Sequence, residues 1–323
     1  MSKKKNGFLG KFGGLFSSTA QLQRIVILTG VVLLLGAGSF GAYYYFDRYY
    51  QPQTKQAEVQ LKEAQAAVQA DPNSITKRLD LADKYMMNKK WDEALSQLAQ
   101  AEMANPTETQ HQTILVNTGV CYYMLGKYID AIDPLQQFVT ARQDEEMASL
   151  DPQLKAAAYY LGDSLLRLER YDEAVKPLEQ SVQWSKTDAD AMYKLGVAYA
   201  KIGEDARALD MFTFTVAFVP DFAEAYQEMA TIYQRIDQPA MVDYANGMVA
   251  YSQKDYEGAL ALLTKAESAK KDASGIYLGL GFVYEALKDN AKALESYDTV
   301  LKLDPANLSA INGSQRLGAL MKK

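Results

Sequence analysis

The sequence has very few of the residues that enzymes use to bind metals or to attack substrates. It contains one cysteine, Cys121, and one histidine, His111, among 323 residues. One cysteine cannot form an internal disulfide, and one histidine cannot by itself build a metal site or a catalytic triad. Neither a GxxxxGK[ST] pattern nor a GxGxxG after a strand-like segment occurs. We therefore expect no catalytic, cofactor-binding or metal-binding residues, no cofactor, and a chain that is not an enzyme.

Helix-breaking residues are also scarce, and the acidic excess is unevenly placed. Only 9 prolines and 20 glycines are present, and hydrophobic residues make up 48% of the chain, which suits a helical protein with a continuous core. The net charge is −6, yet Lys3, Lys4, Lys5, Lys11 and Arg24 all precede the first acid, so the remainder carries −11. An acidic body repels phosphate, which argues against nucleic acid and favours neutral or basic protein partners.

A long uncharged run distinguishes the amino-terminal region. Residues 25–46 read IVILTGVVLLLGAGSFGAYYYF, and as a helix they would extend about 33 Å, enough to cross a bilayer. Tyrosines and a phenylalanine gather at its far end, where aromatic rings favour the headgroup level. Because basic residues precede the run, we expect residues 1–24 to be a cytoplasmic head, with the rest of the chain on the periplasmic or extracellular side.

A cleaved signal peptide is the alternative for this segment. The residues Ala37-Gly38-Ser39 offer small side chains at a possible cleavage site. However, the polar head is long, and the apolar run exceeds the roughly 7–15 residues typical of signal peptides. We therefore favour an uncleaved transmembrane helix that anchors the protein in the lipid bilayer.

Six similar segments recur along the rest of the chain. Each carries an alanine at the same register, and successive alanines are separated by 37, 43, 34, 51 and 34 residues. The gap of 51 equals one and a half periods of 34. A period of about 34 is typical of stacked helix-turn-helix repeats. The alanines are Ala94, Ala131, Ala174, Ala208, Ala259 and Ala293.

The repeats divide the body into three parts. We expect a linker helix within 47–74, which ends before Asp71-Pro72, then a solenoid of about six repeats over 75–307, and a capping helix over 308–323. The pattern is irregular over 223–252. One helix there is either missing or shared between two repeats, and we expect this to interrupt the regular superhelix near residue 238. The acidic residues after Gln143 predict a longer loop or an extended helix.

The motif within each repeat resembles the tetratricopeptide repeat. The resemblance extends over about 53–321, and it implies an all-α, right-handed solenoid, preceded here by one transmembrane helix. Proteins with this repeat generally bind other proteins. The residues that carry the resemblance most clearly are Leu195, Gly196, Tyr199, Ala208, Phe212 and Pro220 in the fourth repeat, and Tyr277, Leu280, Gly281, Tyr284, Ala293, Tyr297 and Pro305 in the last.

The same resemblance predicts a protein-binding groove lined by the first helix of each repeat. At the corresponding positions, Leu79 and Asp83 replace the lysine and asparagine that family members use to grip chaperone carboxylates, so that mode is not expected. The other positions carry tyrosine, valine and methionine, and also Asp163, Arg167 and Asp190. The predicted groove residues are Leu79, Asp83, Met86, Met87, Val116, Val120, Tyr123, Met124, Tyr159, Tyr193 and Val197.

These observations favour a membrane-anchored scaffold or assembly factor that holds a peptide or helix of another protein in the groove. Two alternatives stay open at this stage. One is a permanent structural subunit of a larger membrane complex. The other is a protein-transport receptor of an organelle membrane, which would require the opposite topology.

Overall fold

The computed structural model describes residues 51–144 and 147–320, with side chains from Gln56 onward. Every regular element in these ranges is a helix. The predicted cytoplasmic head and the predicted transmembrane helix at 25–46 lie outside the described residues. Among the helices that are described, none combines the length and hydropathy needed to cross a bilayer. The described chain forms two compact units, of which the first ends at Lys90 and the second begins at Trp91.

The first unit is a pair of helices, α2 (Gln51–Ala70) and α3 (Ile75–Met87). Leu61, Ala64 and Val68 repeat at three- and four-residue intervals on α2, so they share one face, and they pack against Leu81 of α3. Gln65 Nε2 donates a 3.0 Å hydrogen bond to Tyr85 Oη across the pair. In the region 47–74, where the sequence predicts a linker helix that ends before Asp71-Pro72, the structure has α2.

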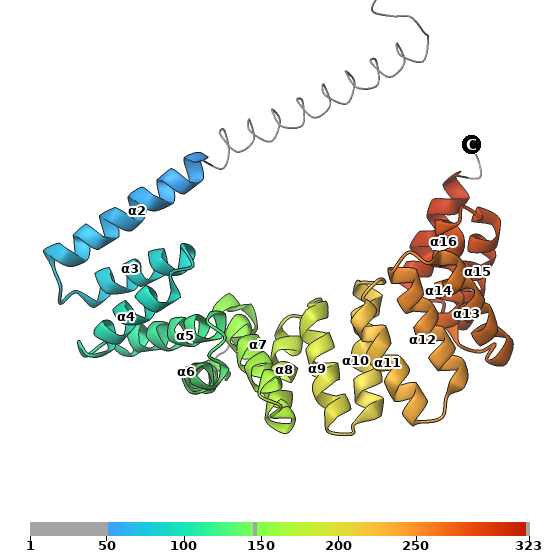
Figure 1. Cartoon of the computed structure of the whole chain (residues 1–323), viewed down its shortest axis with the longest axis horizontal. Helices are drawn as coiled ribbons and strands as arrows, with labels where there is room; N and C mark the ends of the chain where they lie inside the picture. The colour runs from blue at the N-terminus through green and yellow to red at the C-terminus, as the bar shows by residue number, and fades with distance from the viewer. Residues whose placement is uncertain (1–50, 145–146, 321–323) are drawn as a thin grey trace, which may run out of the picture. The chain divides into compact units, whose positions relative to one another are not determined.

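The second unit is a series of helices that stand beside one another in sequence order (Figure 1). We call the first helix of each repeat the A helix and the second the B helix. A buried core runs from Val116 to Val283 without interruption at residue 238. The helices are α4 (Trp91–Glu102), α5 (Glu108–Met124), α6 (Tyr128–Arg142), α7 (Pro152–Arg167), α8 (Tyr171–Trp184), α9 (Ala189–Lys201), α10 (Asp205–Phe218), α11 (Ala223–Arg235), α12 (Pro239–Ser252), α13 (Tyr256–Ala269), α14 (Ser274–Ala286), α15 (Asn290–Leu303) and α16 (Leu308–Leu320).

On five of the A helices, a glycine allows the following B helix to approach closely. A Cβ atom added to Gly196 of α9 would lie 2.6 Å from Phe212 Cε1 of α10, which is closer than real Cβ contacts. The same clash would arise at corresponding positions, against a leucine or tyrosine sixteen residues later each time. This contact therefore explains the recurring glycine of the sequence motif. The other pairs are Gly119 with Leu135, Gly162 with Leu178, Gly247 with Leu263 and Gly281 with Tyr297.

Turn geometry shows how the array passes through the irregular region. In this unit, each A helix is joined to its B helix by three residues, of which the middle one has a positive φ, as at Gly126 and Gly203. Turns of this type occur on both sides of α12, at Asp237 and at Lys254. Of the two alternatives, the structure therefore has the shared helix. α12 follows α11 as a B helix does and precedes α13 as an A helix does, so one helix accounts for the extra half period.

Two further segments differ from a simple repeat, namely the connection between α6 and α7 and the carboxyl-terminal helix α16. Between α6 and α7, a short 3-10 helix, η3 (Ala148–Leu150), precedes Asp151, whose side chain caps α7 and pairs with Arg142 at 2.8 Å. At the carboxyl end, Ala310 and Leu317 of α16 are buried, as expected for a helix that covers the last repeat. Leu308 is the first residue of α16, precedes the buried face of the helix and is 73% exposed.

Candidate functional site

The predicted groove residues of α3 form no cluster of their own. Leu79 and Met86 are half-buried, whereas Asp83 and Met87 are exposed. Asp83 accepts a 3.2 Å hydrogen bond from the neighbouring Lys84. These four residues belong to the first unit, and they present a mixed polar and apolar surface there.

The predicted residues of the second unit divide into core and surface. Val116 is 3% exposed and belongs to the core, so it offers a partner no surface. Half-buried positions on three successive A helices make up the rest, apart from Met124, which is 41% exposed. Half-burial gives these side chains a fixed position while one edge stays accessible. The half-buried residues are Val120 and Tyr123 on α5, Tyr159 on α7, and Tyr193 and Val197 on α9.

Asp163 of α7 links these three A helices. Asp163 is only 2% exposed, yet its carboxylate accepts hydrogen bonds from three side chains. Tyr123 Oη of α5 lies 2.6 Å from Oδ2, Arg167 Nε lies 2.7 Å from Oδ2, and Lys194 Nζ of α9 lies 2.8 Å from Oδ1. A buried carboxylate is tolerated when such partners surround it. We call Tyr123, Asp163, Arg167 and Lys194 the Asp163 cluster.

The electrostatics of the cluster favour the ionised carboxylate. Burial alone would raise the pKa of Asp163, but hydrogen bonds from Lys194, Tyr123 and Arg167 outweigh it and hold the pKa below its usual value. Burial and then the hydrogen bond to Asp163 raise the pKa of the Tyr123 hydroxyl. Asp163 is therefore a fixed negative charge and Tyr123 a neutral donor at physiological pH.

Aromatic rings continue the cluster across α5, α6 and α7. The Tyr123 ring lies 4.5 Å from the Tyr160 ring and 5.7 Å from the Tyr128 ring, measured between centroids. The Arg167 guanidinium lies 5.1 Å from the centroid of Tyr128, within cation–π range. Arg167 is thus held by both a carboxylate and a ring, while its side chain remains 46% exposed.

A second group joins α7 to α9. The Tyr159 hydroxyl donates a hydrogen bond to Asp190, and Lys194 Nζ lies 5.7 Å from the Tyr159 ring centroid. Lys194 Nζ also lies 3.9 Å from Asp190 Oδ2, so this lysine is shared between the two groups. Burial and then the bond to Asp190 raise the pKa of Tyr159.

Sequence reasoning found some members of this surface and missed others. The groove positions of the repeat include Tyr123, Tyr159, Asp163, Arg167 and Asp190. They do not include Lys194, Tyr128 or Tyr160, which lie beside those positions. Lys194 follows Tyr193 directly on α9, and its reach toward Asp163 depends on how α7 and α9 pack, which a single repeat motif does not specify.

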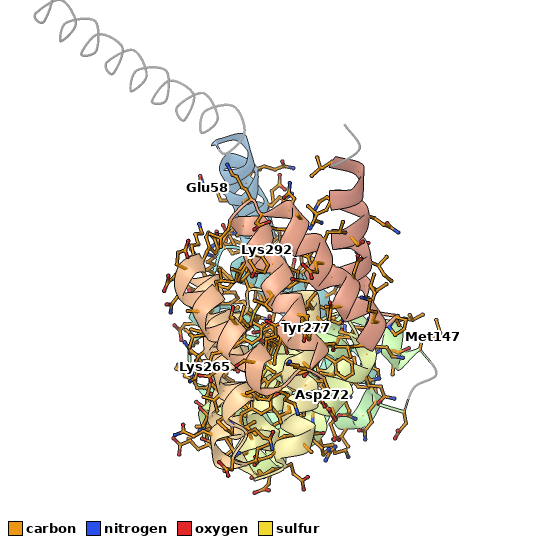
Figure 2. All side chains as sticks on the ribbon, turned by 90° about the vertical axis from the view of Figure 1, so that its right-hand side faces the viewer. Glu58, Met147, Lys265, Asp272, Tyr277 and Lys292 are labelled. Atoms are coloured by element: carbon orange, nitrogen blue, oxygen red, sulfur yellow. The ribbon has the colours of Figure 1, made fainter. Side chains whose placement is uncertain are left out.

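Three other polar features of the second unit lie outside these two groups. His111 Nδ1 lies 2.9 Å from Glu102 Oε1, and Cys121 is fully buried, which raises the pKa of its thiol to about 12. A pocket of about 150 Å³ between α13, α14 and α15 is lined by Tyr277 and Lys292, both labelled in Figure 2. Lys292 pairs with Asp289 at 3.3 Å. Within the described ranges, no group of three or more potential metal ligands comes together.

Comparison with protein families identifies the repeat. Models described as tetratricopeptide repeat match residues 79–146 and 250–315, and a model described as TPR repeat matches 162–203. A TPR repeat-containing protein of Methanocaldococcus jannaschii is 24% identical over 217 residues, which amount to 66% of this chain and 36% of that protein. The matched part therefore spans about a third of that relative.

Three solved structures illustrate the similarity to known chains, each with a TM-score below 0.5. A crystal structure of MamA is 24% identical and covers 60% of this chain and 94% of its own, with a TM-score of 0.43. MamA from Desulfovibrio magneticus is 19% identical and covers 59% and 96%, with a TM-score of 0.44. YrrB, described as a TPR protein with an unusual peptide-binding site, is 17% identical and covers 78% and 97%, with a TM-score of 0.44.

Proposed function

We propose that this chain, which contains tetratricopeptide repeats, is a scaffold or assembly factor that binds other proteins through the A helices α5, α7 and α9. The observation that carries this proposal is the Asp163 cluster. Three successive A helices contribute to it, and it fixes Tyr123 and Arg167 at positions that the repeat motif assigns to the groove. Tyrosine, methionine and arginine are common in protein interfaces, and tyrosine loses little side-chain entropy on binding.

The cluster favours binding because it reduces the entropy cost of association. Each tyrosine or arginine that is already held by hydrogen bonds loses less conformational freedom when a partner arrives. The Arg167 guanidinium is positioned by Asp163 and Tyr128, yet half of its side chain is accessible. The exposed Met124 next to Tyr123 adds an adaptable apolar contact.

The amino-terminal segment supports a second part of the proposal. Residues 25–46 have the length and hydropathy of a transmembrane helix, and the basic residues before them favour a cytoplasmic head. The repeats would then lie on the periplasmic or extracellular side and meet partners at the membrane. We expect the chain to resist carbonate extraction. We also expect the repeats to be cleaved by protease added on the outer side only. A mature chain that begins after residue 46 would reject the anchor.

Site-specific photocrosslinking tests the binding surface. A benzoylphenylalanine at Met124 should give discrete crosslinked products in native membranes. Met103, which is 83% exposed in the turn after α4, provides a matched methionine control that should give none. Equal products from both positions, or none from Met124, would reject the assignment. A product recovered in fixed stoichiometry after mild detergent purification would indicate a permanent subunit rather than a transient scaffold.

A further inference from the structure

We compare two successive steps of the array, where a step is the contact between one A helix and the next. The same three repeat positions occur in both steps, but they carry different charges. Tyr159 on α7 contacts Asp190 and Lys194 on α9, as described above. One period of 34 residues further along, these positions hold Tyr193 on α9 and Glu224 and Glu228 on α11. The tyrosine and the first acid therefore recur, whereas the lysine is replaced by glutamate.

At the first step, the chain supplies its own cation. Lys194 Nζ lies 5.7 Å from the Tyr159 ring centroid and also contacts the carboxylates of Asp163 and Asp190. The negative charges of this step are therefore compensated by a lysine that approaches the ring. At this step, the tyrosine, the acid and the lysine of the chain therefore form a charge-compensated group.

At the second step, the corresponding cation is absent from the described residues. No described lysine or arginine lies over the Tyr193 ring, and neither Glu224 nor Glu228 forms an ion pair with a described residue. Glu224 is exposed and Glu228 is half-buried. Val197 occupies the position that corresponds to Asp163, and there it packs an apolar side chain against the core instead of adding another acid.

The Tyr193 ring is held in place without being covered. Its centroid lies 5.0 Å from that of Phe222 and 5.9 Å from that of Phe212, so two aromatic contacts fix its orientation. The ring nevertheless remains partly accessible, and its hydroxyl forms no hydrogen bond with another described residue. Burial first, and then the charges of Glu228, Glu224 and Asp190, raise the pKa of Tyr193 to about 12. Helices α9 and α11 contact each other, so the two glutamates lie on the helix beside the one that carries the ring.

We propose that Tyr193, Glu224 and Glu228 bind a lysine or arginine side chain presented by a partner protein, in the place that Lys194 occupies one repeat earlier. This inference rests on the proposed function, because it assigns a chemical preference to the same surface. A cation above a tyrosine ring and between two carboxylates gains both cation–π and ion-pair interactions. Charge complementarity identifies the occupant as a basic segment of a protein, which also agrees with the acidic body of the chain.

Selection from a phage-displayed library of random dodecapeptides tests the proposal with the full chain in mild detergent. Peptides selected by the native chain should be enriched in lysine and arginine. Glu228→Lys supplies the cation from within the chain, as Lys194 does, and should remove that enrichment. Asp298→Lys makes the same change of net charge at an exposed position of α15 and should leave the enrichment unchanged.

Fluorescence anisotropy with a selected peptide provides the quantitative measurement. Glu228→Lys should weaken binding at least about tenfold, and replacement of the basic residue of the peptide by glutamine should have a similar effect. Glu228→Gln, which removes charge without adding a cation, should weaken binding less and should also reduce its salt dependence. Far-UV circular dichroism checks that each variant is folded.

Three outcomes separate this inference from the proposed function. Basic enrichment that disappears in Glu228→Lys supports both. If the selected peptides show no basic preference, or keep that preference in Glu228→Lys, the inference is overturned. If those peptides no longer bind a Tyr123→Ala variant, the result would still support the proposed binding surface. Failure to select any peptide with the native chain would overturn both.

Discussion

Gly196 of α9 lies against the ring of Phe212 of α10, so close that a Cβ atom would come within 2.6 Å of Cε1. The phenylalanine is fully buried, and the ring cannot withdraw without moving neighbouring core residues. The same contact recurs in other repeats. A methyl group at this position therefore probes how tightly the two helices of a repeat must pack.

Gly196→Ala should destabilise the chain by about 1–3 kcal/mol, because overpacking forces the ring or the helices to shift. Gly318→Ala on α16 is the matched control, since nothing lies within 4 Å of its added Cβ. That change should be neutral or stabilise by up to about 1 kcal/mol through higher helix propensity. Urea unfolding followed by far-UV circular dichroism measures both. Equal effects of the two changes would contradict the close contact.

Asp163→Asn should remove stability at neutral pH by about 1–3 kcal/mol, because Lys194 loses its principal carboxylate in a nearly buried site. This expected loss of stability is smaller than for a fully buried ion pair, because the Arg167 side chain is 46% exposed. Glu173→Gln removes a carboxylate from an exposed pair with Arg170 and should change stability much less.

The loss caused by Asp163→Asn should depend on pH in a defined direction. The folded pKa of Asp163 lies below its usual value, so its contribution is present above the unfolded pKa of about 3.9 and is lost as pH falls through the folded pKa. The difference between the native chain and the variant should therefore be constant between neutral pH and about pH 5, and should narrow below about pH 4. A difference that widens on acidification would contradict this account.

Gly203→Ala should destabilise by about 1 kcal/mol, although its added Cβ meets no atom within 4 Å. The reason is conformational, since Gly203 has a φ of 85° in the turn between α9 and α10. Glu169 adopts a φ of 58° at the corresponding position of the preceding turn. Glu169→Gly should accordingly be neutral or stabilising, by up to about 1 kcal/mol. Opposite signs for the two changes, measured by urea unfolding, are the expected result.

Cys121 should react with thiol reagents slowly in the folded chain and rapidly in urea. Its side chain is fully buried, and burial raises the pKa of the thiol to about 12, so both access and thiolate population are low. A cysteine introduced at the exposed Met103 in a Cys121→Ala background provides the control for an accessible thiol. Comparable rates for the two thiols in native buffer would show that α5 opens readily.

The repeat motif predicted the fold because its signals arise within one repeat. The glycine, the alanine and the large residue sixteen positions after the glycine meet inside a single helix pair, so their spacing is visible in the sequence. The single-sequence pattern also indicated an extra half period after Tyr226. It could not choose between a missing and a shared helix, because that depends on the left-handed turns at Asp237 and Lys254, where no glycine marks the positive φ.

The candidate site was less predictable, because it depends on contacts between repeats. Val116 and Tyr159 occupy the same repeat position, yet the short valine is covered in the core, whereas the tyrosine extends to Asp190 on the next A helix. Side-chain length therefore decides whether this position belongs to the core or to the surface. Lys194 was missed for a related reason, since its partner Asp163 belongs to the preceding repeat.

The shared helix α12 also has a directional consequence for anything that lies along the A helices. Loops of three or four residues make successive helices antiparallel from α7 to α16, as in other helical hairpins. The A helices α7, α9 and α11 therefore run in one direction, whereas α12 and α14, which follow the half period, run in the opposite direction. An elongated ligand that extended past α11 would meet helix amino termini, with their partial positive charge, at the opposite edge of the array. The shared helix thus divides the A-helix array into two segments whose helices run in opposite directions.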